Sequence, residues 1–392
     1  MRLSSIRDFI RDALSQADHI LLLLCLSVNL YGIALIYSAT RYDATLHASP
    51  YKQLVAMVLG VLIFFLFSQL DLDLVLSKWP WIFAVSALLI VLLAIPGIGH
   101  EVGGNRSWID LKLFSVQPSE IVKITFTLLF GKQLVYLQRE HDLNHTLSVL
   151  SLCLHTGFFV FLLYLTSSDA GSALVYLIIA VVMLWAAGLK YYWFLLGLAL
   201  ALLGGSALWM MLPENNYWKM RILVCFNHDL DPTYRGFQQT RSLLAIQSGK
   251  LEGMGYLQGN LTQATYKSAL PARHTDFIFS VCCEELGLIG AAILLLLLTA
   301  LILRCLFIAL DASSPLYGYI AMGFTGMFLF QIILNIGMCL FVLPVIGLTL
   351  PFVSYGGSSL VTAYAAMGIL SGIKQRSLPS WLKGTSADDW TE

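Results

Sequence analysis

The sequence predicts an all-α polytopic membrane protein with ten transmembrane helices and a large extracytoplasmic loop between helices 7 and 8. Its 392 residues are 58% hydrophobic and only 12% charged, whereas a soluble domain has roughly 45–50% apolar and about 25% charged residues. The mean hydropathy of +0.77 reflects more apolar side chains than a water-surrounded core can hide. Lys and Arg together number 23, as do Asp and Glu, so the basic excess of a nucleic-acid-binding protein is missing. These values exclude an ordinary soluble enzyme, a disordered protein and a nucleic-acid binder.

The ten spans are windows of about 20 mostly apolar residues, the length that crosses a hydrocarbon core roughly 30 Å thick. The fourth window is interrupted by Glu120 and Lys123, and the eighth contains Glu284 and Glu285. Both count as helices because the flanking loops fit them and no continuous apolar alternative exists. The windows lie at residues 19–38, 51–70, 79–98, 118–138, 146–166, 170–187, 191–212, 277–309, 316–342 and 351–373.

The basic residues of the short loops predict the orientation. With the N-terminus inside, eleven Lys and Arg residues fall in cytoplasmic segments and five in short outer segments, as the positive-inside rule requires. We therefore expect both termini to be cytoplasmic. The expected organisation is an N-terminal cytoplasmic or interfacial segment at 1–18, helices 1–7 at 19–212, an extracytoplasmic loop at 213–276, helices 8–10 at 277–374 and a cytoplasmic tail at 375–392.

Charged residues inside the predicted spans need an explanation, because each costs several kcal/mol by insertion scales. Glu120 and Lys123 are three residues apart, which places them on one face of a helix where they can pair. Such a pair either locks two helices together or acts directly in a polar cavity, and the sequence leaves both interpretations open. Asp169 stands at a tight corner between two spans, where we expect it to cap the following helix.

Adjacent carboxylates at Glu284 and Glu285 point about 100° apart on a helix. At most one of them can face any given partner. We expect one to pair with an Arg or Lys and the other to contact water.

The 64-residue loop at 213–276 is too long for a simple connector. It carries more basic than acidic residues, and such a surface attracts a phosphate-bearing lipid headgroup. Its glycines allow backbone to approach a ligand closely; a solvated loop with incidental charges is the alternative. The residues concerned are Lys219, Arg221, Arg235, Arg241, Lys250, Lys267 and Arg273, with Gly249, Gly253, Gly255 and Gly259.

A carboxylate stands where this loop meets the eighth span. Asp276 follows Arg273 and His274; the cation stabilises the ionised Asp, and the imidazole can move a proton near neutral pH. This arrangement suits a general base that acts on a hydroxyl held at the membrane surface.

Four stretches of the chain together resemble the SEDS family of cell-wall glycosyltransferases, the RodA/FtsW/SpoVE type. The similarity extends over about residues 20–375, and the wording of residues 118–123 (PSEIVK) favours the RodA branch. The four stretches are 105–111 (NRSWIDL) with 117–123 (QPSEIVK), the loop segments 221–227, 231–232 and 236–238, residues 274–279 (HTDFIF) with 284–287 (EELG), and 347–359 (GLTLPFVSYGGSS).

The resemblance implies a ten-helix fold and polymerisation of lipid II into glycan strands at the outer face of the bacterial cytoplasmic membrane. It makes Asp276 the candidate catalytic base on the acceptor sugar hydroxyl, with undecaprenyl diphosphate leaving. Arg106, Lys123 and Arg221 are the candidates for neutralising the leaving diphosphate, a bound divalent metal ion being the alternative. Glu120 would orient Lys123. The other candidate substrate-binding residues are His274 and Glu285, and the candidate structural or cavity-lining residues are Asp169, Ser358 and Ser359.

Two other classes of function remain open from the sequence: a lipid II flippase and a scaffold for a separate cell-wall synthase. The polar constellation clusters at the outer surface rather than across the midplane, which favours the enzyme. The resemblance also implies a partner, a class B penicillin-binding protein transpeptidase.

Overall fold

Among the residues that the computed structural model of the protein describes, ten helices occupy the ten expected spans. The structure describes residues 15–43, 45–95, 99–102, 105–110, 115–214, 216–231, 236–266 and 268–377, so most of the predicted N-terminal segment and of the C-terminal tail lie outside the described residues. The helices are α2 (His19–Thr40), α3 (Ser49–Ser68), α5 (Trp79–Val91), α6 (Pro118–Glu140), α7 (Thr146–Ser167), α8 (Ala170–Ala186), α9 (Tyr191–Met211), α12 (Ile278–Leu310), α13 (Pro315–Cys339) and α14 (Gly357–Ser377).

Apolar length supports the assignment of a multi-pass membrane protein. Among the described residues, six helices are long and apolar enough to cross a membrane, namely α2, α3, α7, α9, α12 and α13, and two shorter apolar helices correspond to α5 and α8. Helices α6 and α14 are more polar and fall outside that set, since α6 contains the Glu120–Lys123 pair.

The structure adds elements that apolar windows did not predict. A three-stranded antiparallel sheet, β1 (Gly99–Val102), β2 (Asn105–Asp110) and β3 (Ser115–Val116), precedes α6. The large loop contains α10 (Tyr217–Phe226) and α11 (Phe237–Gly249), and α4 (Leu72–Ser77) joins α3 to α5. These elements are too short to carry an apolar window of span length.

The tenth helix begins at Gly357, not at residue 351 as expected. Residues 340–356, here called the α13–α14 segment, are not helical, and Phe352 has a left-handed backbone with φ of 64°. Hydrogen bonds hold this turn: the Leu350 amide donates to Ser354 Oγ at 2.8 Å, and Gln53 Nε2 donates to the Ser354 carbonyl at 3.1 Å. Local bonds of this kind compete with helix formation.

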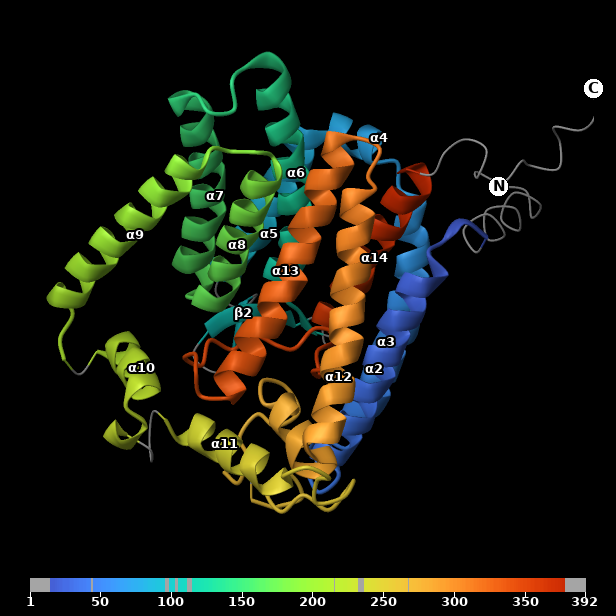
Figure 1. Ribbon diagram of the computed structural model, residues 1–392, viewed down its shortest axis with the longest axis vertical. Helices are drawn as coiled ribbons and strands as arrows, with labels where there is room; N and C mark the ends of the chain where they lie inside the picture. Colours follow the sequence, from blue (N-terminus) through green and yellow to red (C-terminus); the bar gives the residue numbers. More distant parts are fainter. Residues whose placement is uncertain are drawn as a thin grey trace, which may run out of the picture.

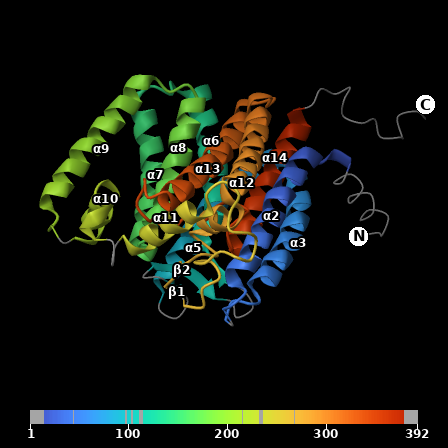
Figure 2. The same cartoon turned by 60° about the horizontal axis from the view of Figure 1, so that its bottom comes forward.

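The helices form one bundle, from which α9 leans away (Figure 1). No residue of α9 is buried. At one end of the bundle α10, α11 and the rest of the large loop gather, and Figure 2 shows them on the same end as the sheet.

At the opposite end, Asp18 joins three helices. Its carboxylate caps α2 and receives Arg304 at 2.7 Å and Lys374 at 3.2 Å, from α12 and α14. Its amide also donates to Ser371 Oγ at 2.8 Å.

Helices α3 and α14 pack closely because glycines stand at their contact. A Cβ at Gly368 of α14 would lie 2.5 Å from the Phe64 carbonyl oxygen, and a Cβ at Gly60 of α3 would lie 2.3 Å from the Tyr364 ring. Small residues at helix–helix contacts in membranes allow this approach.

Substitution of Gly368 by Ala is therefore expected to lower the free energy of unfolding of the purified protein by about 1–3 kcal/mol, the typical cost of overpacking, and with it the melting temperature. The control is Gly204→Ala in α9, where a Cβ meets nothing within 4 Å; it is expected to be neutral or slightly stabilising. Thermal melting in detergent measures both. Equal melting temperatures for Gly368→Ala and wild type would contradict the close packing.

Candidate functional site

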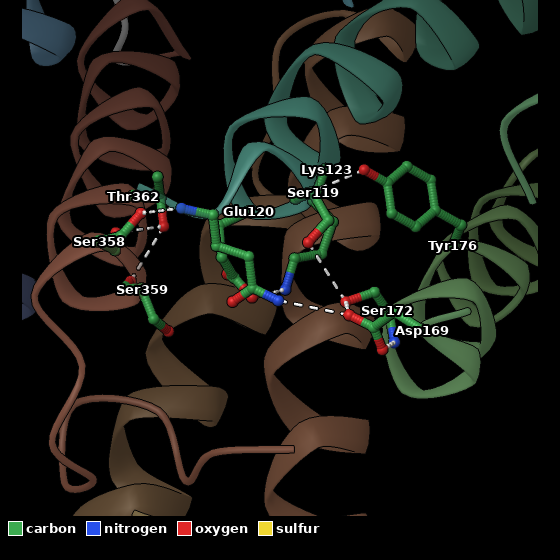
Figure 3. Close-up of polar contacts among 10 residues, drawn as sticks. Ser119, Glu120, Lys123, Asp169, Ser172, Tyr176, Ser358, Ser359 and Thr362 are labelled. Carbon is green, nitrogen blue, oxygen red and sulfur yellow. Dashed lines mark hydrogen bonds and ion pairs between the residues drawn. The ribbon is translucent and has the colours of Figure 1, made fainter. Parts of the chain in front are cut away.

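A polar cluster joins the start of α6 to α8 and α14 (Figure 3). Asp169 caps α8 as expected, accepting from the Ser172 amide at 3.0 Å. Its other oxygen accepts from Ser172 Oγ at 2.8 Å and from Gln117 Nε2 at 3.3 Å. Tyr176 donates to the Ser119 carbonyl at 2.8 Å. These contacts fix the first turn of α6 against α8.

The expected pair of Glu120 and Lys123 is present inside this cluster. Lys123 Nζ lies 2.7 Å from Glu120 Oε1, and the two side chains are 1% and 12% exposed. Both residues line a small cavity between α6, α13 and α14, together with Gln331 and Ser359. The pair therefore contacts an internal space as well as bridging one turn of α6.

The start of α14 contributes the two serines singled out in the sequence. Ser358 Oγ accepts from the Gln117 amide at 3.2 Å, so this hydroxyl bonds across the bundle. The carbonyls of Ser358 and Ser359 each accept from Thr362 Oγ1 at 3.0 Å. Ser358 also lines a second, much larger cavity.

This larger cavity has a volume of about 1150 Å³ and lies between α3, α6, α14 and the sheet. The cavity has apolar walls along the helices and a polar end. Sequence reasoning missed it because its walls come from distant parts of the chain. The apolar walls include Val55, Leu59, Ile63, Phe67, Ile124, Val361 and Ala365, and the polar end includes Lys52, His100, Asp110, Ser115, Tyr355 and Ser358.

Asp276 lies outside both cavities but is connected to the larger one. The His274 ring is 5.8 Å from the ring of Tyr355, which lines that cavity. Residues 271–277 form turns that lead into α12; Asp276 as a whole residue is partly exposed, while its carboxyl group is largely enclosed by protein. The nearest glycine, Gly347, would place a Cβ 4.0 Å from Asp276 Oδ2.

The surroundings of this turn shift the pKa values of two of its side chains, Asp276 and His274. Burial raises the pKa of Asp276 to about 6, with a smaller opposing effect of a hydrogen bond from Thr275. Burial, and then the charge of Arg273, lower the pKa of His274. At neutral pH the carboxyl group is thus ionised but retains a higher basicity than a solvated Asp, and the imidazole is neutral.

The adjacent carboxylates of α12 are not arranged as expected. Glu284 and Glu285 are both 0% exposed. Glu284 accepts from the Leu261 and Thr262 amides at 2.7 and 2.8 Å, and Glu285 accepts from Ser38 Oγ at 2.6 Å and Gln263 Nε2 at 2.7 Å. The expected ion pair with Arg or Lys is absent from the part of the chain that the structure describes. Neutral donors satisfy these charges instead, which places Glu285 in a buried network rather than in an open binding site.

The loop glycines contact other parts of the protein, not an open ligand space as expected: Gly249 and Gly253 face backbone of α12, and Gly255 and Gly259 face side chains. Helix α12 is broken at Gly287 (φ 63°, ψ −163°). The loop fills the break: the Met254 and Gly255 amides donate to the Glu284 and Glu285 carbonyls at 2.9 and 3.0 Å. A Cβ at Gly253 would lie 2.2 Å from the Glu285 carbonyl oxygen. Position 253 therefore requires glycine, because a side chain there would prevent the loop from packing into the break in α12.

Several basic residues of the loop bond carbonyl oxygens. Arg221 donates to Val345 at 2.6 Å, Arg241 to Ala269 at 2.8 Å and Arg273 to Ala264 at 3.0 Å. They thus hold the loop and the α13–α14 segment in place. Arg106 is exposed on β2. Arg235 and Lys267 lie outside the described residues.

The structure therefore groups the predicted residues into two centres. Glu120, Lys123, Asp169, Ser358 and Ser359 belong to the cluster at the start of α6. His274 and Asp276 belong to the turn before α12. Among the described residues no three His, Cys, Asp or Glu side chains are grouped to hold a metal ion.

These features define a multi-pass membrane protein with polar sites at one end of its helix bundle. A family model for FtsW/RodA/SpoVE cell cycle proteins matches residues 18–378. The chain belongs to this family, the SEDS family of peptidoglycan glycosyltransferases.

Named relatives extend over almost the whole chain. Stage V sporulation protein E of Bacillus subtilis (strain 168) is 33% identical over 93% of this chain and 98% of the relative. The peptidoglycan glycosyltransferase MrdB of Escherichia coli (strain K12) is 33% identical over 91% and 93%. Equal identity to both gives no preference for the RodA branch that residues 118–123 favoured.

Solved structures agree with this fold. A chain from a structure titled "Structural coordination of polymerization and crosslinking by a peptidoglycan synthase complex" matches with a TM-score of 0.78 at 31% identity, covering 92% of this chain and 98% of that one. The rod shape determining protein RodA of Thermus thermophilus matches with a TM-score of 0.67 at 28% identity, covering 93% and 98%.

Removing one partner of the buried Glu120–Lys123 pair should destabilise the protein more than removing both. Lys123→Met leaves an uncompensated carboxylate, at an expected cost of about 3–5 kcal/mol, and the double variant Glu120→Gln/Lys123→Met should recover most of this. Melting temperatures of the two single variants and the double variant measure the coupling.

The double variant also separates the two interpretations of the pair. A folded double variant without glycan-polymerising activity assigns the pair a direct role in the cavity. A folded and active one shows that the pair only locks the helix. Additive melting-temperature changes would contradict the coupling itself.

Proposed function

We propose that this protein polymerises lipid II into glycan strands at the outer face of the cytoplasmic membrane, with Asp276 as the general base. The observation that carries the proposal is the placement of Asp276. Asp276 is a partly exposed residue with a raised pKa, and it lies next to His274 in the turn that leads into α12. A base whose pKa lies near the working pH combines sufficient ionisation with sufficient basicity.

The large cavity supports a lipid-linked substrate. Its apolar walls on α3, α6 and α14 suit a polyprenyl chain, and its polar end carries Lys52, His100 and Ser358 for a headgroup. Tyr355 connects this end to His274 through the ring contact at 5.8 Å. A headgroup that extends past Tyr355 would thus approach the turn that carries Asp276.

The proposed reaction is a direct displacement at the anomeric carbon of the donor. The Asp276 carboxylate takes the proton of the acceptor sugar hydroxyl, whose oxygen attacks the anomeric carbon of the donor. The bond from that carbon to the diphosphate oxygen breaks, and undecaprenyl diphosphate leaves with the electron pair. Direct displacement inverts the anomeric centre. The leaving group needs charge neutralisation more than protonation, for which Lys123, Arg106 and Arg221 are the proposed cations.

The membrane arrangement and the partner belong to the same proposal. The ten helices cross the membrane with both termini in the cytoplasm, which places the 213–276 loop and Asp276 outside. The similarity to a chain of a peptidoglycan synthase complex that couples polymerization and crosslinking supports a class B penicillin-binding protein as the crosslinking partner.

Replacing Asp276 by Asn is expected to lower glycan polymerisation by at least about 100-fold, the usual contribution of a general base. The measurement is the rate of glycan polymer formation from labelled lipid II by the purified protein together with a candidate transpeptidase. The matched control is Asp311→Asn, the same substitution at the opposite, exposed end of α12. Full activity of Asp276→Asn at equal folded yield would refute the base assignment, and movement of lipid II across liposomes without polymer would favour a flippase.

The pH dependence of polymerisation should show an acid limb near pH 6. The active form of Asp276 is the carboxylate, and burial raises its pKa to about 6. Activity is therefore expected to fall as the pH drops through about 6, two units above the limb that a solvated Asp would give. Initial rates between pH 4.5 and 8 measure this, with melting curves at each pH to exclude unfolding. A flat profile down to about pH 4.5 would contradict the assignment.

A further inference from the structure

We propose that Asn335 of α13 is a positioning residue that fixes the backbone of Asp276 and so aims its carboxylate. This inference rests on the proposed function, because it assigns Asn335 a role through the catalytic base. Asn335 was not singled out from the sequence. It lies in the last turn of α13, four residues before that helix ends at Cys339, and shows no charge or motif that distinguishes it.

Asn335 joins two segments that are far apart in the sequence. Its side chain is 0% exposed. Nδ2 donates to the Asp276 carbonyl at 3.0 Å and to the Leu348 carbonyl at 2.7 Å. Both amide protons are therefore used, one on the turn before α12 and one on the α13–α14 segment. A primary amide supplies two donors from one planar nitrogen, which a hydroxyl of similar size does not.

The contact belongs to a consistent pattern along the turn. Three consecutive carbonyls each accept a hydrogen bond from the region after residue 334. The His274 carbonyl accepts from the Tyr355 amide at 2.9 Å, and the Thr275 carbonyl accepts from Ser354 Oγ at 2.6 Å. The Asp276 carbonyl accepts from Asn335. Residues 274–276 thus have their carbonyls fixed from outside, because the turn has no regular ladder of its own.

The reaction rate depends strongly on where the carboxylate of a general base lies. The Asp276 carboxylate is attached to the backbone that Asn335 holds, and Gly347, beside Oδ2, belongs to the segment that Asn335 also holds. A misplacement of about 1 Å at a reacting group can cost about 100-fold in rate. Binding of the lipid chain in the cavity along α3 and α14 does not involve Asn335. Loss of the amide should therefore lower kcat and leave KM nearly unchanged.

The test uses Asn335→Ala and the isosteric Asn335→Asp, whose carboxyl group can donate to only one of the two carbonyls when protonated and to neither when ionised. The control is Thr325→Val on the same helix, because Thr325 is also buried and its hydroxyl bonds only to the Ala321 carbonyl of α13. Lipid II polymerisation by the full-length protein with its transpeptidase gives kcat and KM, and hydrogen exchange of peptides covering 270–280 reports the turn directly.

We expect both Asn335 variants to lose about 10- to 100-fold in kcat with KM within about twofold of wild type, and to exchange faster at residues 270–280. Thr325→Val should match wild type in all three. In the Asp276→Asn background, Asn335→Ala should cause no further loss, since it acts through Asp276.

Three results would overturn the proposal. These are wild-type kcat for Asn335→Asp, a rise in KM that accounts for the whole loss, and an equal further loss in the Asp276→Asn background. The proposed function fails separately: full activity of Asp276→Asn would refute the base assignment, and with it the catalytic meaning of Asn335. An inactive Asp276→Asn beside a fully active Asn335→Ala would refute the positioning role alone.

Discussion

The constraint on which this structure depends is that non-helical backbone packed within a membrane protein must find its hydrogen bonds inside the protein. Two such segments meet at the candidate site: the turn at residues 271–277 and the α13–α14 segment. Ser354 and Tyr355 of the α13–α14 segment donate hydrogen bonds to carbonyl oxygens of the turn. Asn335 donates to one carbonyl oxygen of each segment. The site therefore consists of irregular backbone held in one arrangement, which suits a reaction that needs a carboxylate at a fixed place.

The same constraint explains the large loop. Helix α12 is broken at Gly287, and residues 250–255 replace its missing bonds: the Leu288 and Ile289 amides donate to the Lys250 and Leu251 carbonyls, as the loop amides donate to α12. Glu284 then fixes the next stretch of the loop by accepting from Leu261 and Thr262. The Glu284 carboxyl group, the loop glycines and the break in α12 together anchor the loop beside the start of α12, where Asp276 lies.

Buried charge serves different purposes at the two ends of the bundle. Asp18 is shared by Arg304 and Lys374 and ties together three helices. Glu120 and Lys123 pair within one helix and contact a cavity. A charge kept in a membrane protein is compensated locally, and the second pair also lines a cavity.

The sequence by itself determined the helices, because span length and apolar composition are local properties: all ten expected windows hold a helix. Local spacing also determined the Glu120–Lys123 pair and the Asp169 cap. The sheet, α10 and α11 were not predicted, since elements this short carry no apolar window of span length. Only the tertiary structure decided the partners of Glu284 and Glu285, the role of the loop glycines, the large cavity and the contacts of Asn335. Each of these joins residues tens to hundreds of positions apart, and no spacing along the chain encodes which distant backbone group a buried donor will meet.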